Sequence, residues 1–163
     1  MFMRFLWIIF LTLSCSFSAS YAQDGITLQV GEKTAAVGET VCVPITANDF
    51  TGILSTQYTL QWDTRYLEFE TITNFGLPWL SGSNFGDQRT ADGLLTVVWI
   101  DNSLKGVDRT ADQVLFDVCF EVKAGRGQKA YIGFAEDPTP FEVVNRAEQV
   151  ILLNPVPGGV IVK

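Results

Sequence analysis

The sequence comprises 163 residues, of which 47% are hydrophobic and 12% aromatic; this is too hydrophobic for a disordered chain and fits one ordinary domain. Its 11 Lys and Arg against 18 Asp and Glu give a formal charge of −7, which excludes a basic surface for nucleic acid or for anionic membranes. The absence of His excludes Ser-His and Cys-His catalysis and His-ligated zinc or haem.

Residues 1–22 are predicted to form a secretory signal peptide. Arg4 precedes an apolar run from Phe5 to Leu13, and Ser20 and Ala22 supply the small residues that a signal peptidase reads. Cleavage after Ala22 leaves 163 minus 22, or 141, residues. We therefore expect a secreted protein, extracellular or at the cell surface, without a membrane span after cleavage.

Cleavage after Ala22 has two alternatives. A retained membrane anchor is disfavoured because the apolar run is short for a bilayer span of roughly 20 residues. A lipoprotein modified at Cys15 is disfavoured because Thr12 stands where a lipobox has Leu.

The remainder, residues 23–163, is predicted to be a single all-β domain. Short apolar stretches rich in Val, Ile, Thr and aromatic residues recur between Gly, Asn and Asp, and no stretch with helical spacing exceeds about two turns. The expected strands are Ile26–Val30, Thr40–Ala47, Ile53–Trp62, Leu67–Thr73, Leu94–Asp101, Val114–Lys123, Ala130–Ala135 and Val160–Val162, with weaker candidates at Phe141–Val144 and Val150–Leu153. This pattern favours a two-sheet β-sandwich or jelly roll.

The two cysteines of the secreted chain, Cys42 and Cys119, are candidates for one disulfide, with two unpaired thiols as the alternative. Odd-numbered residues of Val41–Ile45 and even-numbered residues of Phe116–Val122 are aliphatic or aromatic and are predicted to face the core. Both cysteines then lie on the outer side of their strands, as a cross-strand disulfide requires.

The same alternation assigns faces in two further strands. Residues predicted to face inward are Thr56, Tyr58, Leu60 and Trp62 in the first and Leu95, Val97 and Trp99 in the second. Residues predicted to face outward are Ser55, Gln57, Thr59 and Gln61 in the first and Thr96 and Val98 in the second.

No catalytic, cofactor-binding or metal-binding residues are predicted. Glycoside hydrolysis needs two carboxyl groups facing each other across a cleft. The pairs Glu68 with Glu70 and Asp101 with Asp108 are explained more simply as solvated acids, and no loop has the Asp/Asn spacing of an EF-hand.

Nearly all of residues 24–163 resembles the cohesin domain family. The resemblance rests on the order of several short motifs rather than on any one of them. The motifs are Gly38-Glu-Thr-Val-Cys-Val-Pro-Ile45, Gly52-Ile53, Leu60-Gln-Trp-Asp63, Leu67-Glu68, Leu94 to Ser103, Leu115 to Gly125 and Gly158-Gly-Val-Ile-Val162.

This resemblance implies a jelly-roll sandwich of about nine strands whose partner is a dockerin module in polysaccharide degradation or surface assembly. It also implies that the strands of Cys42 and Cys119 are neighbours, and that any calcium belongs to the dockerin. Cohesins bind through one sheet face formed by the third, fifth, sixth and eighth strands. The partner-binding residues expected on that face are Ser55, Gln57, Thr96, Val98, Asp101 and Ser103.

Two other function classes remain open. A carbohydrate-binding module, with polysaccharide as partner, needs an exposed aromatic ring. Trp62 and Trp99 are predicted to be buried, so Trp79, in the irregular segment 74–93, is the candidate for stacking on a sugar. A structural subunit of a cell surface or filament is the third possibility.

Overall fold

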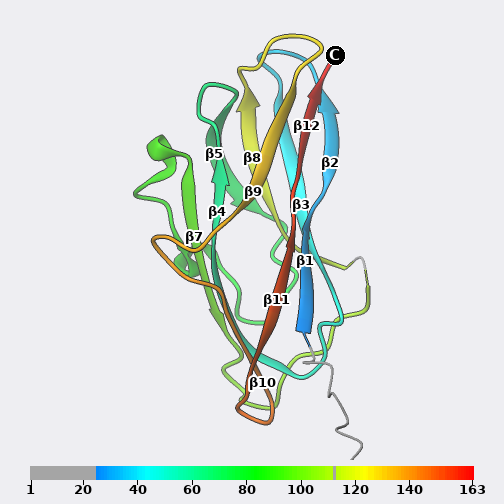
Figure 1. Cartoon of the computed structure of the whole chain (residues 1–163), viewed down its shortest axis with the longest axis vertical. Helices are drawn as coiled ribbons and strands as arrows, with labels where there is room; N and C mark the ends of the chain where they lie inside the picture. The colour runs from blue at the N-terminus through cyan, green and yellow to red at the C-terminus, as the bar shows by residue number, and fades with distance from the viewer. Residues whose placement is uncertain (1–24, 112) are drawn as a thin grey trace, which may run out of the picture.

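The computed structural model describes residues 25–111 and 113–163 (Figure 1). The expected signal peptide and its cleavage after Ala22 lie outside the described residues. The elements of the described part are β1 (Gly25–Val30), β2 (Glu32–Ala35), β3 (Thr40–Asn48), β4 (Ile53–Trp62), β5 (Leu67–Thr73), η1 (Gly82–Asn84), β6 (Phe85–Gly86), η2 (Thr90–Asp92), β7 (Leu94–Ile100), β8 (Val114–Val122), β9 (Lys129–Ala135), β10 (Glu142–Asn145), β11 (Val150–Val156) and β12 (Gly158–Val162). None of the helices among these residues is long and apolar enough to cross a membrane.

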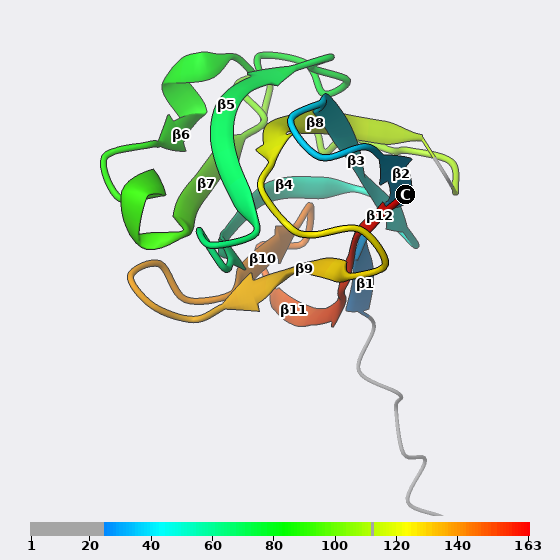
Figure 2. The same ribbon diagram turned by 90° about the horizontal axis from the view of Figure 1, so that it is seen from above.

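The strands form two layers, which Figure 2 shows from above. In the first layer β5, β8, β3 and β1 pair in that order, all antiparallel. In the second layer β4 is central: it pairs with β7 and also with β9 and β10. Beyond these neighbours, β12 and β2 continue the layer from β9, and β6 continues it from β7. The predicted all-β sandwich is confirmed.

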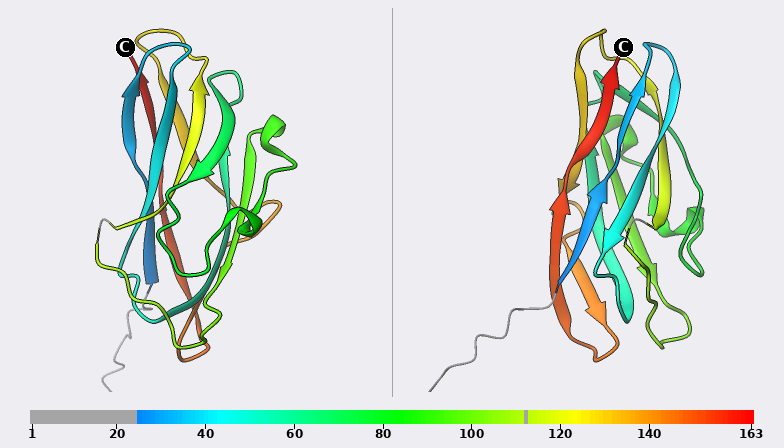
Figure 3. Two further views of the ribbon diagram at one scale, coloured as in Figure 1. Left: turned by 180° about the vertical axis from the view of Figure 1, so that it is seen from behind. Right: turned by 90° about the vertical axis from the view of Figure 1, so that its right-hand side faces the viewer.

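The two layers are joined along one edge by the ends of the chain. There β11 pairs in parallel with β1 and antiparallel with β10, so it contacts both layers. Figure 3 shows these terminal strands side by side. Both terminal segments are interrupted, the first at Gly31 and the second at Pro157. At Pro157 the cause is that proline has no N–H to donate to a strand ladder. The next residue, Gly158, must be glycine, because an added Cβ would lie 2.2 Å from the carbonyl oxygen of Val30.

The described residues form twelve strands, where about nine were expected, because two long strands are interrupted and one very short strand is added. The interruptions divide each terminal segment in two, giving β1 with β2 and β11 with β12. Two of the twelve strands were not predicted: β2, and β6, which has only two residues. Every strand predicted from the sequence is present, with its bounds shifted by a few residues at most.

The core between the layers follows the predicted alternation. Val43 and Ile45 from β3 are buried against even-numbered residues of β8, such as Phe116 and Phe120. Trp99 is 1% exposed, and its indole Nε1 donates a hydrogen bond to the carbonyl oxygen of Pro78 at 2.7 Å. This bond attaches the irregular segment 74–93 to the core.

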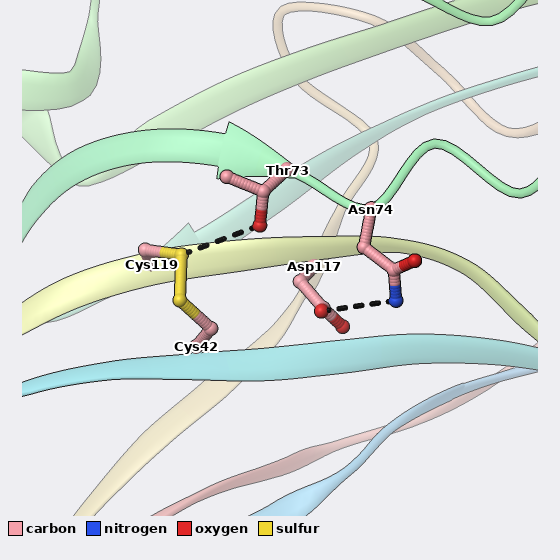
Figure 4. The surroundings of a disulfide bond; sticks show 5 residues. All are labelled: Cys42, Thr73, Asn74, Asp117 and Cys119. Atoms are coloured by element: carbon pink, nitrogen blue, oxygen red, sulfur yellow. Dashed lines mark hydrogen bonds between the residues drawn. A yellow bond between two sulfur atoms is a disulfide. The ribbon is translucent and has the colours of Figure 1, made fainter.

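Cys42 and Cys119 face each other across β3 and β8 and are joined by a disulfide (Figure 4). Their Cα atoms are 3.9 Å apart, and 77 positions separate them in the sequence. Cys42 is exposed, as expected for the outer side of a strand. Cys119 is only 2% exposed, although it lies on the same side, because the disulfide and Thr73, whose Oγ1 is 3.7 Å from its sulfur, cover it. The structure therefore contains the predicted disulfide rather than two free thiols.

Candidate functional site

Strand register places two rows of side chains on the outer side of the second layer. In the first row Ile100 of β7 lies opposite Ser55 of β4, which lies opposite Val144 of β10, which lies opposite Val150 of β11. In the second row Val98, Gln57 and Glu142 follow in the same strand order, and Leu152, two residues along β11 from Val150, points to the same side. We call these eight residues the apolar band.

Large apolar side chains of the apolar band are exposed at both of its ends. The exposed fractions are 42% for Val98 and 51% for Ile100 on β7, and 62% for Val150 and 48% for Leu152 on β11. Ser55, Gln57 and Val144 between them are half-buried, and Glu142 is exposed. Several exposed apolar side chains on one face of a soluble protein indicate an interaction surface.

The outer side of the first layer has a different chemistry. Its outward residues surround the disulfide and are mostly threonines and acids: Thr40, Thr46, Glu68, Thr71, Thr73, Asp117 and Glu121. Lys123 bridges two of these acids, with Nζ 2.9 Å from Glu68 and 2.8 Å from Glu121. Among the residues that the structure describes, the large exposed apolar side chains on an outer sheet face therefore lie on the second layer.

The structure brings four of the predicted partner residues together. Ser55, Gln57 and Val98 belong to the apolar band, and Thr96 lies beside it on β7, half-buried against Gly86 of β6. The predicted inward set is buried, with Thr56, Tyr58, Leu60, Trp62, Leu95, Val97 and Trp99 all at or below 5% exposure. Alternation therefore correctly predicted the inward residues of both strands.

Asp101 does not lie on this surface, contrary to the expectation for a partner residue. Strand β7 ends at Ile100, and the Asp101 side chain turns back into the following loop, where the residue is 0% exposed. Its Oδ1 accepts from the backbone N and the Oγ of Ser103 at 2.9 and 2.7 Å, and its Oδ2 accepts from Lys105 N at 3.1 Å and Gly106 N at 2.8 Å. The carboxylate holds the loop, and Ser103 is exposed at its tip with its hydroxyl used in this contact.

Burial opposes ionisation of Asp101, yet these donated hydrogen bonds outweigh burial and hold the pKa of its carboxyl below the ordinary value. Asp101 is therefore a structural anion in the described loop. No group of three or more Asp, Glu or Cys side chains in the described ranges has the arrangement of a metal site.

Sequence reasoning missed five residues of the apolar band: Ile100 of β7, the two β10 residues Glu142 and Val144, and the two β11 residues. The local signal for β11 was present, since Val150 and Leu152 alternate with Ile151 and Leu153. What the sequence does not show is the pairing of β11 with β10 and of β10 with β4, which carries these side chains to the same face as Ser55.

Trp79 is 50% exposed, as its predicted role in stacking on a sugar requires. Its φ of 58° lies in the left-handed region, which is strained for a large non-glycine residue. Its neighbours Leu77 and Leu80 are buried, so the segment is fixed on both sides of the exposed ring. Trp62 and Trp99 are 5% and 1% exposed and are unavailable for stacking.

Comparison with known protein families gives one match that covers most of the chain. The family model described as Cohesin domain matches residues 26–148. A curated relative, cellulose-binding protein A of Clostridium cellulovorans, is 28% identical over 99 residues. That alignment covers 61% of this chain and 5% of the relative, so the chain spans a small part of that protein's length.

Solved structures share the fold at low sequence identity. A chain of the type I cohesin–dockerin complex Coh-OlpA-Doc918 from Clostridium thermocellum superposes with a TM-score of 0.71 at 18% identity, covering 85% of this chain and 99% of the other. The sixth cohesin of Acetivibrio cellulolyticus scaffoldin B, in complex with a Cel5 dockerin, gives 0.71 at 22% identity with the same coverage. A non-cellulosomal cohesin from the archaeon Archaeoglobus fulgidus gives 0.60 at 16% identity, covering 84% and 91%.

Proposed function

Because the chain belongs to the cohesin domain family, we propose that it is a non-catalytic module that docks a dockerin-bearing protein. The observation that carries the proposal is the apolar band, an exposed surface of four strands on only one of the two outer faces. Solved cohesins of the same fold occur in complexes with dockerins, which supports the choice of partner.

The dimensions of the apolar band suit a helix of the partner. Four strands spaced about 4.8 Å apart place the outermost strands roughly 14 Å from each other. A helix rises about 1.5 Å per residue, so about ten helical residues span the band. Apolar side chains at i, i+3, i+4 and i+7 on such a helix would contact Val98 and Ile100 at one end and Val150 and Leu152 at the other.

Charge favours a partner with a basic residue near the centre of the contact. Glu142 is the acidic member of the apolar band, and the whole chain carries a formal charge of −7. Such complementarity mainly raises the association rate and sets the orientation of the two proteins.

The test is titration calorimetry of the purified secreted chain against recombinant dockerin modules of the producing organism, with calcium present. We expect at least one dockerin to bind, and EDTA to abolish binding without changing the melting temperature of this chain, since the calcium belongs to the dockerin. Absence of binding to every calcium-loaded dockerin would overturn the proposal.

We also propose that the protein is exported, extracellular or at the cell surface, with Gln23 as its first residue. The charged start, the apolar run and the small residues before Gln23 support this, and a disulfide is typical of an oxidising compartment. Intact-mass analysis of the exported protein should give the mass of residues 23–163. A mass that includes residues 1–22 would contradict the assignment.

A further inference from the structure

The molecule has a concave surface apart from the apolar band, where β4 ends beside β9. This hollow has a volume of about 570 Å³, within the range of roughly 300–1,000 Å³ typical of small-ligand sites. It is lined by Gln61, Trp62, Asp63, Thr64, Tyr66, Asp92, Lys129, Tyr131 and Gly133. Neither the partner residues expected from the sequence nor Trp79 belong to it.

Tyr131 provides an accessible aromatic ring in the hollow. The residue is 64% exposed, and Lys129 Nζ lies over one face of its ring, 5.0 Å from the ring centroid. Gly133, two residues along β9 on the same side, leaves open space beside the ring, because a Cβ added there would meet only Pro157 Cβ at 3.9 Å. Packing does not demand glycine at this position, and its missing side chain keeps the hollow open.

Hydrogen-bonding groups surround this ring. Gln61 is exposed and presents an amide with both donors and an acceptor. Asp63 is fixed in place by Arg65, whose Nη2 is 2.6 Å and Nε 3.0 Å from its carboxylate oxygens, and this pairing lowers the pKa of the Asp63 carboxyl. Asp63 is therefore an oriented acceptor with lone pairs to spare.

The charged residues of the hollow already have partners of opposite charge. The ion pairs are Asp63 with Arg65, Asp92 with Arg89 and Lys129 with Glu32. An ionic ligand would therefore find no unpaired charge there, and the overall charge of −7 disfavours an anionic one. The combination of an exposed ring with fixed donors and acceptors fits a neutral molecule that has both hydroxyl groups and apolar C–H faces.

We propose that the hollow binds a neutral glycan, with a sugar ring stacked on Tyr131 and its hydroxyl groups hydrogen-bonded to Gln61 and Asp63. This activity goes beyond the docking of a dockerin. It also places the sugar-binding aromatic on β9 rather than at Trp79.

The experiment is affinity gel electrophoresis of the purified chain in gels containing soluble neutral polysaccharides (β-glucan, xyloglucan, arabinoxylan or galactomannan), with polygalacturonate as the anionic comparison. Tyr131→Ala removes the ring, and Gly133→Leu fills the hollow at a position where the protein has room for a side chain. Trp79→Ala is the matched aromatic control outside the hollow. Val98→Asp, in the apolar band, is the control for docking.

We expect at least one neutral glycan to retard the wild-type chain. Both hollow variants should lose affinity by about tenfold or more, while Trp79→Ala and Val98→Asp bind as wild type does. Tyr131→Ala should still bind the dockerin, which separates this proposal from the docking function. The proposal is overturned if no neutral glycan retards the wild type, if Gly133→Leu binds glycan normally, or if only Trp79→Ala loses binding. Loss of dockerin binding rather than glycan binding in Gly133→Leu would likewise overturn it, because the hollow would then belong to the protein interface.

Discussion

Thr59 and Thr139 are hydrogen-bonded to each other in both directions. The Oγ1 of Thr59 donates to the carbonyl oxygen of Thr139 at 3.0 Å and accepts from its backbone N at 3.1 Å. Thr59 is consequently 0% exposed although it points out of its sheet. The segment between β9 and β10 thus crosses the outer side of β4 and separates Gln57, in the apolar band, from Gln61, in the hollow. This separation is why the two proposed sites can be changed independently.

The first prediction concerns the apolar band. Val98→Asp places a charge among exposed apolar side chains, and Gln57→Ala removes a central hydrogen-bonding group; together they should weaken dockerin binding by about tenfold or more. Neither residue belongs to the core, so the melting temperature should change little. Thr71→Asp, on the outer face of the opposite layer, is the matched control and should bind as wild type does. Unchanged affinity in the folded double variant would move the interface elsewhere.

The second prediction concerns Trp99, whose side chain fills the core directly beneath the apolar band. Trp99→Ala should lower the free energy of unfolding by about 3–5 kcal/mol, because a large cavity replaces a fully buried ring. The substitution also leaves the carbonyl oxygen of Pro78 without its donor. Trp99→Phe should cost less, since it keeps most of the buried volume. Urea denaturation measures both, and equal stability of Trp99→Ala and wild type would refute the burial of this residue.

The third prediction concerns the disulfide. Closing a loop of 77 residues stabilises the folded chain by roughly 4 kcal/mol in the chain-entropy account. A Cys42→Ser, Cys119→Ser double variant should therefore unfold at lower denaturant concentration. In parallel, thiol titration of the unfolded, non-reduced wild-type chain should find no free thiol at these two positions. Two titratable thiols would show that the bond does not form.

The fourth prediction concerns pH. The pKa of Asp101 is depressed in the folded state, so its ionised form stabilises the protein above the ordinary carboxyl pKa of about 3.9. That contribution is lost as the pH falls from this value through the lower pKa of the folded state. Asp101→Asn should lower the melting temperature at pH 7, and the difference from wild type should shrink as the pH approaches 3. A difference that stays constant from pH 7 to pH 3 would show that the charge of Asp101 is not what holds the loop.

Alternation identified the strands and their faces because the period of two residues is a local property of the chain. It correctly buried Tyr58 and Leu60 and exposed Val98. The expectation that Asp101 belongs to the partner surface came from the family resemblance and not from alternation, because the odd-numbered residues Val97 and Trp99 of this strand face inward. The sequence Asp101-Asn-Ser103 followed by Gly106 is typical of a turn in which an Asp side chain caps backbone N–H groups, so a local signal existed.

Other features depend on contacts between distant parts of the chain, and no local pattern reports them. The hydrogen bond between Thr59 and Thr139, which covers Thr59, joins positions 80 residues apart in the sequence. The hollow likewise needs the end of β4 beside β9, a pairing of Gln61 with Gly133 that only the folded chain reveals. The candidate site was therefore predictable strand by strand, but its extent across the sheet was not.

The position of the disulfide also determines how the protein responds to a protease. Cys42 and Cys119 bracket β4, β5, β6 and β7, together with the irregular segment 74–93. A single backbone cut anywhere between the two cysteines yields two fragments that are still covalently joined. A cut after Cys119, for example in the turn between β10 and β11, instead frees a C-terminal fragment held only by non-covalent contacts, namely its strand pairing and its core residues. In denaturing gel electrophoresis, molecules cut between the two cysteines run as one band without reductant and as two bands with it. The redox state of this one disulfide therefore decides whether a cut in the irregular segment 74–93 separates the two fragments.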